Sequence, residues 1–205
     1  AKEEESVFLS QLELQSIFER AMRRAGLQLS FSRGFHPLPL LTFGRALPVG
    51  VASRAEWFAV VLREARQPGD IIRSMQQGMP RGITFLYCEE LAYKKNLPQA
   101  VRETFLLECL SFAKIRSFKE AWQNFAGLDK FFWTRDTKKG ERTLDARALT
   151  SSITFQSDAI VELTFDWSVT YVSPLALCCA VCPETSITDL RLTKLQQEFD
   201  SSIRK

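Results

Sequence analysis

Residues 10–50 read SQLELQSIFERAMRRAGLQLSFSRGFHPLPLLTFGRALPVG and place a helix, a loop and a strand in succession. The helix begins at Ser10, because its hydroxyl can accept from the backbone N–H of Glu13 while that carboxylate reaches back. It ends at Gly26, which tolerates the backbone conformation that follows a helix. Apolar residues recur between these ends at helical spacing and predict one buried face. They are Leu14, Ile17, Phe18, Ala21 and Ala25.

The rest of the first half continues with strand and helix signals. Residues 56–63 form a nearly continuous apolar run, which is typical of a strand buried on both faces. The sequence QPGD at 67–70 opens a second helix, since proline is favoured in the first helical turn. If residues 7–8 form a leading strand, the order becomes βαββαβ, the ferredoxin-like arrangement. The other expected elements are strands at 38–43 and 83–91 and a helix at 71–77.

The second half repeats this order without obvious sequence identity. Alternating apolar and polar residues at 160–167 indicate a half-buried strand, and Pro174 suits the first turn of a helix. Strands on both sides of DTKKG, residues 136–140, predict a hairpin. The expected strands are 105–112, 131–135, 142–147, 153–155, 160–167 and 190–195, and the expected helices are 117–125 and 174–181.

A polar segment at 93–102, YKKNLPQAVR, contains Pro98 and separates the two halves. Its composition is typical of a linker. The chain length of 205 residues fits two domains of ordinary size. We therefore expect an α+β protein of two ferredoxin-like βαββαβ units in tandem, at residues 1–92 and 103–205.

The composition excludes several classes of protein. The formal net charge of +3 is too small for binding of polyanions by bulk charge, so a nucleic-acid site needs local clusters. The sequence contains no run of about 18 apolar residues, so we expect no membrane partner. An odd number of cysteines, five, without a disulfide-like framework indicates a reducing, cytoplasmic setting.

Arg20 and Arg24 form the first candidate binding site. They lie one helical turn apart, and like charges at this spacing repel each other. Glu19 can pair with Arg23, which leaves Arg20 and Arg24 without an obvious local partner. The pair either contacts an anionic partner such as RNA phosphate or forms a solvated helix face.

The loop at 30–37 is the second candidate site. Ser32, Arg33 and Gly34 can cradle an anion through backbone N–H groups and a guanidinium, although the loop has no phosphate-binding signature. His36, the only histidine, can act as a general base or contact phosphate. The alternative is a plain turn that His36 stabilises by bonding its own backbone. No nucleophile–base spacing is present, so we expect no catalytic residue.

The hairpin tip is the third candidate site. Lys138, Lys139 and Arg142 surround it and can contact nucleic-acid phosphates. Exposed lysines at such a turn also keep sheet edges soluble, which is the alternative interpretation.

Three cysteines gather at 178–182, CCAVC. Cys179 and Cys182 have a CxxC spacing, but one such pair cannot complete a zinc site and no histidine follows. The apolar surroundings favour packing. We therefore expect no metal site in this chain.

Residues 8–58 resemble the opening of a bacterial family of unknown function, the radical-SAM-linked or radical-SAM-associated proteins, also known as DUF2344-like. A weaker similarity covers TKKG at 137–140 and LDAR at 144–147. Gln11, Glu13 and Leu38 depart from the family pattern, so the titratable His/Asp pair usual at the helix start is absent. The matching parts are Leu9-Ser10, Arg20, RRAGL at 23–27, Ser32, GFHP at 34–37 and LPVGV at 47–51.

The resemblance implies an accessory role beside a radical SAM enzyme. The chain begins without methionine, which fits a C-terminal module of such a protein. The iron–sulfur cluster and S-adenosylmethionine are expected only in the associated radical SAM domain, and this chain is expected to carry no cofactor of its own.

Together these features predict a non-catalytic module that binds an anionic substrate, with RNA as the first choice. One alternative is an enzyme or binding domain for a small phosphorylated or nucleotide-like molecule at the 30–37 loop. Another is a protein–protein adaptor, which would expose an apolar patch in place of a charged one.

Overall fold

The computed structural model describes residues 1–91, 99–137 and 140–199. It is an α+β protein, as the sequence predicts. The described chain divides into two compact units, residues 1–99 and residues from 100 onward. None of the helices in the described part is long and apolar enough to cross a membrane.

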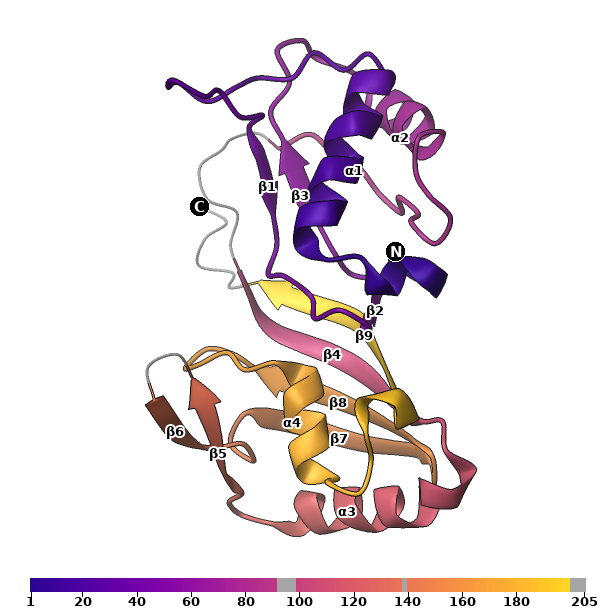
Figure 1. Cartoon of the computed structure of the whole chain (residues 1–205), viewed down its shortest axis with the longest axis vertical. Coiled ribbons are helices and arrows are strands. Elements are labelled where there is room, and N and C mark those ends of the chain that lie inside the picture. Colours follow the sequence, from indigo (N-terminus) through magenta and orange to yellow (C-terminus); the bar gives the residue numbers. More distant parts are fainter. Residues whose placement is uncertain (92–98, 138–139, 200–205) are drawn as a thin grey trace. The chain divides into compact units, whose positions relative to one another are not determined.

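The first unit is built around two helices, α1 (Gln11–Arg24) and α2 (Pro68–Gln76). The predicted capping box is confirmed, because Ser10 accepts from the Glu13 backbone and the Glu13 carboxylate accepts from the Ser10 backbone. The strands are short: β1 (Leu41–Phe43), β2 (Ala52–Ser53) and β3 (Phe58–Val60). β1 pairs antiparallel with β3, and Figure 1 shows both helices on one side of this pair. The core of this unit includes a cluster of Phe18, Met22, Leu27, Leu29, Met75 and Ile83.

Two expected strands of this unit are wrong, so the first ferredoxin-like unit is not confirmed. Residues 7–8 belong to a short 3-10 helix, Glu4–Phe8. The described residues 83–91 form no strand beyond an isolated bridge at Ile83. The Gln76 side chain explains this, since its amide donates to the Ile83 carbonyl (2.8 Å) and accepts from the Phe85 N–H (2.9 Å). One glutamine thus satisfies backbone groups that a neighbouring strand would otherwise bond.

The second unit carries the regular sheet. Its long strands lie in the order β9-β4-β8-β7, with every neighbouring pair antiparallel. Along the chain these are the fourth, first, third and second strands, and with α3 and α4 they give a βαββαβ order. The bounds are β4 (Ala100–Cys109), α3 (Ile115–Gly127), β7 (Thr150–Ser157), β8 (Ile160–Asp166), α4 (Pro174–Val181) and β9 (Leu190–Phe199), with short 3-10 turns at Phe112–Lys114 and Ile187–Asp189.

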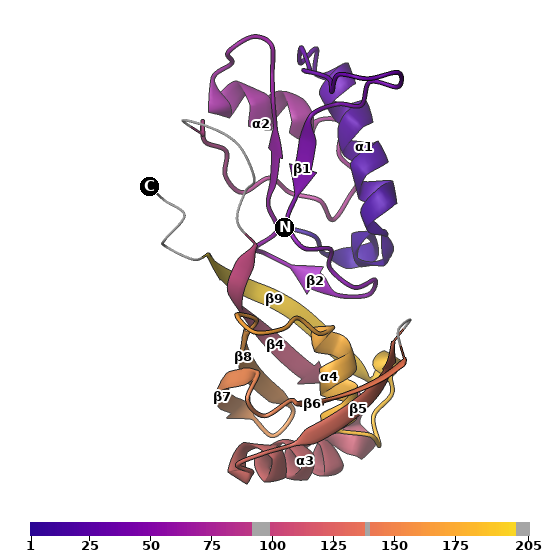
Figure 2. The ribbon, with the colours of Figure 1, turned by 90° about the vertical axis from the view of Figure 1, so that its left-hand side faces the viewer.

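Two details of this unit differ from expectation. β4 already begins at Ala100, so residues 100–102 are strand and not linker, while 93–98 lie outside the described residues. The predicted hairpin, β5 (Phe132–Thr137) and β6 (Gly140–Asp145), is present as a separate two-stranded ribbon inserted between α3 and β7. Figure 2 shows this ribbon apart from the larger sheet.

The core of the second unit contains a charged pair. Glu103 on β4 and Lys194 on β9 are each 2% exposed, and the Lys194 ammonium lies 2.9 Å from a Glu103 carboxylate oxygen. The other carboxylate oxygen accepts from the Trp167 indole N–H at 2.8 Å. Burying a charge is costly unless it is paired and hydrogen-bonded. This pair meets that condition within the fold.

Candidate functional site

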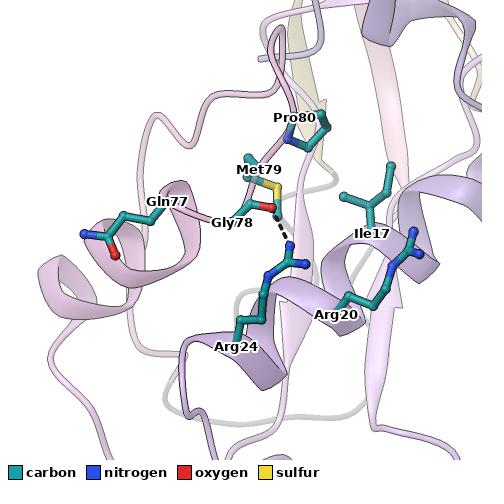
Figure 3. A pocket seen from close by; sticks show the side chains of 7 residues that line it. All are labelled: Ile17, Arg20, Arg24, Gln77, Gly78, Met79 and Pro80. Carbon is teal, nitrogen blue, oxygen red and sulfur yellow. Dashed lines mark hydrogen bonds between the residues drawn. The ribbon is translucent and has the colours of Figure 1, made fainter.

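An open recess of about 410 Å³ lies in the first unit between α1 and the segment that follows α2. Arg20 and Arg24, predicted as a binding pair, both line it. Figure 3 shows them leaving the same flank of α1, with the Arg20 guanidinium beside Ile17 and the Gln77 amide directed away from both arginines. The lining residues are Ile17, Arg20, Arg24, Gln77, Gly78, Met79 and Pro80.

The close approach of Gly78 to α1 forms one wall of the recess. A Cβ atom at Gly78 would lie 3.3 Å from the Ala21 Cβ and 3.2 Å from an Arg24 guanidinium nitrogen. Because Gly78 carries a hydrogen in place of a Cβ atom, the Arg24 guanidinium can approach and donate to the Gly78 carbonyl at 2.7 Å. This contact fixes the Arg24 side chain across the opening between the two segments.

Both arginines of the recess lack a carboxylate partner among the described residues. The Arg20 Nε donates to the Ser16 carbonyl at 3.2 Å, and its terminal nitrogens have no hydrogen-bond partner among the described residues. The expected Glu19–Arg23 pair is not formed, since Glu19 accepts from Gln15 at 3.1 Å. Within the described part of the chain, Arg20 and Arg24 therefore place two positive charges on one flank of α1 without a paired carboxylate.

A contrasting recess of about 520 Å³ in the second unit shows the ordinary situation. Its two cations are neutralised, with Arg116 bonded to Glu120 at 2.9 Å and Lys119 to Asp158 at 2.8 Å. Elsewhere on the first unit, Arg54 and Arg81 also pair with carboxylates.

The loop at 30–37 forms the tip of a finger, defined here as residues 28–40. Two backbone hydrogen bonds hold its stem in place. The Ser30 N–H donates to the Val61 carbonyl outside the finger (2.9 Å), and the Leu40 N–H donates to the Ser30 carbonyl across the stem (2.8 Å). Its tip is closed by Ser32, whose Oγ accepts from the Leu38 N–H at 3.0 Å and whose N–H donates to the Leu38 carbonyl at 2.8 Å.

The finger tip is exposed and does not enclose a pocket. Arg33, Gly34 and His36 are all exposed, and Phe35 is 98% exposed. The His36 ring makes an edge contact with Phe35 at 5.8 Å but has no hydrogen bond to the described residues. Ser32, and not His36, therefore stabilises the turn.

The third predicted site lies in the other unit. Arg142 is exposed on β6 opposite Arg135, while Lys138 and Lys139 lie outside the described residues. The Arg135 guanidinium lies 5.9 Å above the Trp133 ring.

The Asp-Ala-Arg run at 145–147 has a structural role that sequence reasoning missed. An Asp145 carboxylate oxygen accepts from the backbone N–H of Phe131 (3.0 Å) and of Arg147 (3.1 Å). The Arg147 guanidinium donates to the Thr150 carbonyl at 2.7 Å. These contacts join the base of the hairpin to β7.

All five cysteines are free thiols. Burial is the main cause that raises the pKa of the Cys178 thiol well above its ordinary value and that raises the pKa of Cys179 and Cys182. These thiols are protonated near neutral pH and are poor nucleophiles. Within the residues the structure covers, no group of three or more His, Cys, Asp or Glu side chains can hold a metal ion.

The structure thus groups the predicted residues into separate features. Arg20 and Arg24 share the recess, Ser32 to His36 form the finger tip, and Arg142 belongs to the other unit. Sequence reasoning missed the 77–80 wall of the recess, for which the only signal was the turn-forming Gly78 and Pro80 after a helix.

Comparison with known proteins identifies the family of this chain. No curated protein matches the chain. A family model described as an uncharacterized protein conserved in bacteria, DUF2344, matches residues 1–175. The chain therefore belongs to the DUF2344 family of uncharacterized bacterial proteins.

Proposed function

We propose that this chain is a non-catalytic RNA-binding module. The observation that carries the proposal is Phe35, which is 98% exposed at the tip of the finger. A phenylalanine so placed adds nothing to the core, and exposing it to water is unfavourable. Unpaired bases of single-stranded RNA stack on such aromatic rings.

The neighbours of Phe35 fit the same ligand. Arg33 and His36 flank it on the tip, and each can contact the phosphate on either side of a stacked base. The Ser32–Leu38 bonds close the turn that carries Phe35, which reduces the loss of backbone freedom on binding. Because the net charge is only +3, local groups of this kind must supply the affinity.

The exposed position of His36 favours binding over catalysis. A general base must lie within hydrogen-bond reach of the proton that it removes and of an orienting partner. His36 has no hydrogen-bond partner in the described structure, and the finger tip lines neither of the two recesses described above. This geometry supports a role for His36 in contacting RNA and not in catalysis.

The accessory role beside a radical SAM enzyme remains part of the proposal, supported by the resemblance of residues 8–58. We propose a cytoplasmic setting because all five cysteines are free thiols. A pull-down with the full chain tests the partner: a radical SAM protein from the same bacterium should be retained, and its absence from the bound fraction removes this part of the proposal.

Fluorescence anisotropy with a labelled single-stranded RNA tests the RNA-binding role. Phe35→Ala should weaken binding by about 1–3 kcal/mol, the usual contribution of one stacked base. Phe112→Ala is the matched control, because Phe112 is 90% exposed on the second unit and should leave affinity unchanged. Equal affinity of the Phe35 variant and the parent would rule out the stacking role.

The salt dependence of binding gives a second test. Arg33→Gln should reduce the slope of log affinity against log salt by about 0.7, the value for one phosphate contact on a single strand. An unchanged slope would remove Arg33 from the interface even if Phe35 still contributes.

A further inference from the structure

We infer that the recess between α1 and residues 77–80 binds a terminal phosphate monoester together with the nucleoside that carries it. This inference rests on the proposed RNA-binding function and names the part of the ligand that the recess takes. The shared chemistry is a nucleoside monophosphate unit, at an RNA end or as a free nucleotide.

The charges of the recess select the phosphate. Arg20 and Arg24 both line it, and its lining residues in the described chain include no carboxylate. A phosphate monoester carries a charge between about −1.5 and −2 at neutral pH, whereas an internal phosphodiester carries about −1. Two guanidinium groups therefore match the monoester, and their mutual repulsion is relieved when it binds.

The arginines are positioned before any ligand arrives. The Gly78 carbonyl holds Arg24 at 2.7 Å and the Ser16 carbonyl holds the Arg20 Nε at 3.2 Å. Each guanidinium has several N–H donors and spends one on these bonds, so donors remain for phosphate oxygens. Holding both side chains in place lowers the entropy lost on binding.

The remaining walls suit the nucleoside. Ile17, Met79 and Pro80 line the recess beside the arginines and offer an apolar surface to a planar base. A volume of about 410 Å³ lies at the small end of ordinary ligand pockets, roughly 300–1,000 Å³. The recess therefore takes one nucleotide and not a helical segment.

Binding of short RNA oligonucleotides by the full chain tests the inference. A 5′-monophosphate oligomer, a 3′-monophosphate oligomer and the same sequence with hydroxyl ends are compared, with adenosine monophosphate as competitor. One phosphorylated end should bind roughly tenfold to a hundredfold more tightly than the hydroxyl form, as charge-assisted hydrogen bonds contribute.

Substitutions locate the effect. Arg20→Gln should abolish the preference for the phosphorylated end, and Arg24→Lys should reduce it because lysine cannot form the planar fork. Arg23→Gln is the matched control, since Arg23 is exposed on the same helix but does not line the recess. Thermal unfolding of each variant checks that the fold is kept.

The outcomes separate the two proposals. RNA binding that depends on Phe35 but ignores the terminal phosphate overturns the recess and keeps the RNA-binding role. Direct binding of adenosine monophosphate, measured by isothermal titration, that is lost in Arg20→Gln, together with no binding of RNA, supports the recess as a free-nucleotide site and overturns the RNA-binding role. A phosphate preference that survives Arg20→Gln places the phosphate elsewhere and overturns the inference.

Discussion

The two recesses of this protein have similar volumes, about 410 and 520 Å³, but opposite charge compensation. In the second unit, Arg116 and Lys119 each bond a carboxylate. In the first unit, Arg20 and Arg24 line the recess without one among the described residues. An exposed ion pair adds little stability, so its absence costs the fold little and leaves the charge free for a ligand.

The interiors of the two units also differ in how their polar groups are hydrogen-bonded. The second unit holds Glu103, Lys194 and Trp167 in a hydrogen-bonded group beneath a regular sheet. The first unit replaces sheet bonds by contacts from single residues, such as the Gln76 amide. The second unit is thus built on a regular sheet, while the residues that we propose as ligand contacts lie in the first unit.

We expect the greatest loss of stability when the buried ion pair of the second unit is broken. Lys194→Met leaves Glu103 charged and unpaired in the core, which should destabilise the protein by about 3–5 kcal/mol. Urea unfolding followed by tryptophan fluorescence measures it. The double variant Glu103→Gln with Lys194→Met is the control: the Gln carbonyl can still accept from Trp167, so most of the stability should return. A Lys194→Met variant as stable as the parent would show that the pair is dispensable.

The next prediction concerns how far the stability of the first unit depends on close backbone contacts. Gly82 has φ +84°, and a Cβ there would lie 2.2 Å from the Glu3 carbonyl oxygen. Gly82→Ala should therefore cost about 2 kcal/mol or more, from overpacking and from the strained backbone. Gly127→Ala at the end of α3 is the matched control, because nothing lies within 4 Å of its Cβ position. Chemical denaturation of both variants gives the comparison, and equal midpoints would contradict it.

A smaller effect is expected when the second recess is given unpaired cations like those of the first. Glu120→Gln with Asp158→Asn frees Arg116 and Lys119 from their carboxylates. Stability should change by less than about 1 kcal/mol, as for other surface pairs. Affinity for a phosphorylated RNA end should rise a few-fold. Isothermal titration at low salt measures this; an unchanged affinity would mean that free cations alone do not make an anion site.

The smallest effect concerns acid stability in the second unit. Hydrogen bonds from Lys114 and then Ser186 hold the pKa of Asp189 well below its ordinary value of 3.8. The ionised carboxylate therefore stabilises the fold above pH 3.8, and this contribution is lost as the pH falls through the lowered pKa. Asp189→Asn should lower the melting temperature at pH 7, and the difference should shrink below pH 4. A constant difference across this range would exclude the linkage.

Local sequence signals predicted much of the second unit. The alternation at 160–167 and the proline at 174 correspond to β8 and α4, because each pattern can be recognised within a few consecutive residues. The capping box at Ser10 was predictable for the same reason. The strand predicted at residues 83–91 was wrong. Their apolar content suggests a strand, but the Gln76 side chain bonds the backbone groups that a neighbouring strand would otherwise bond.

The helix caps, the alternation of the strands and the charged and aromatic residues available to a ligand could all be recognised in the amino-acid sequence, because each is visible within a few consecutive residues. Three features became visible only in the folded chain: Gly78 lies against Arg24, Phe35 is exposed to water, and Lys194 pairs with Glu103 inside the core. The Arg24–Gly78 and Lys194–Glu103 contacts join residues far apart in the chain, and the exposure of Phe35 depends on which segments surround it; both are set only when the whole chain packs.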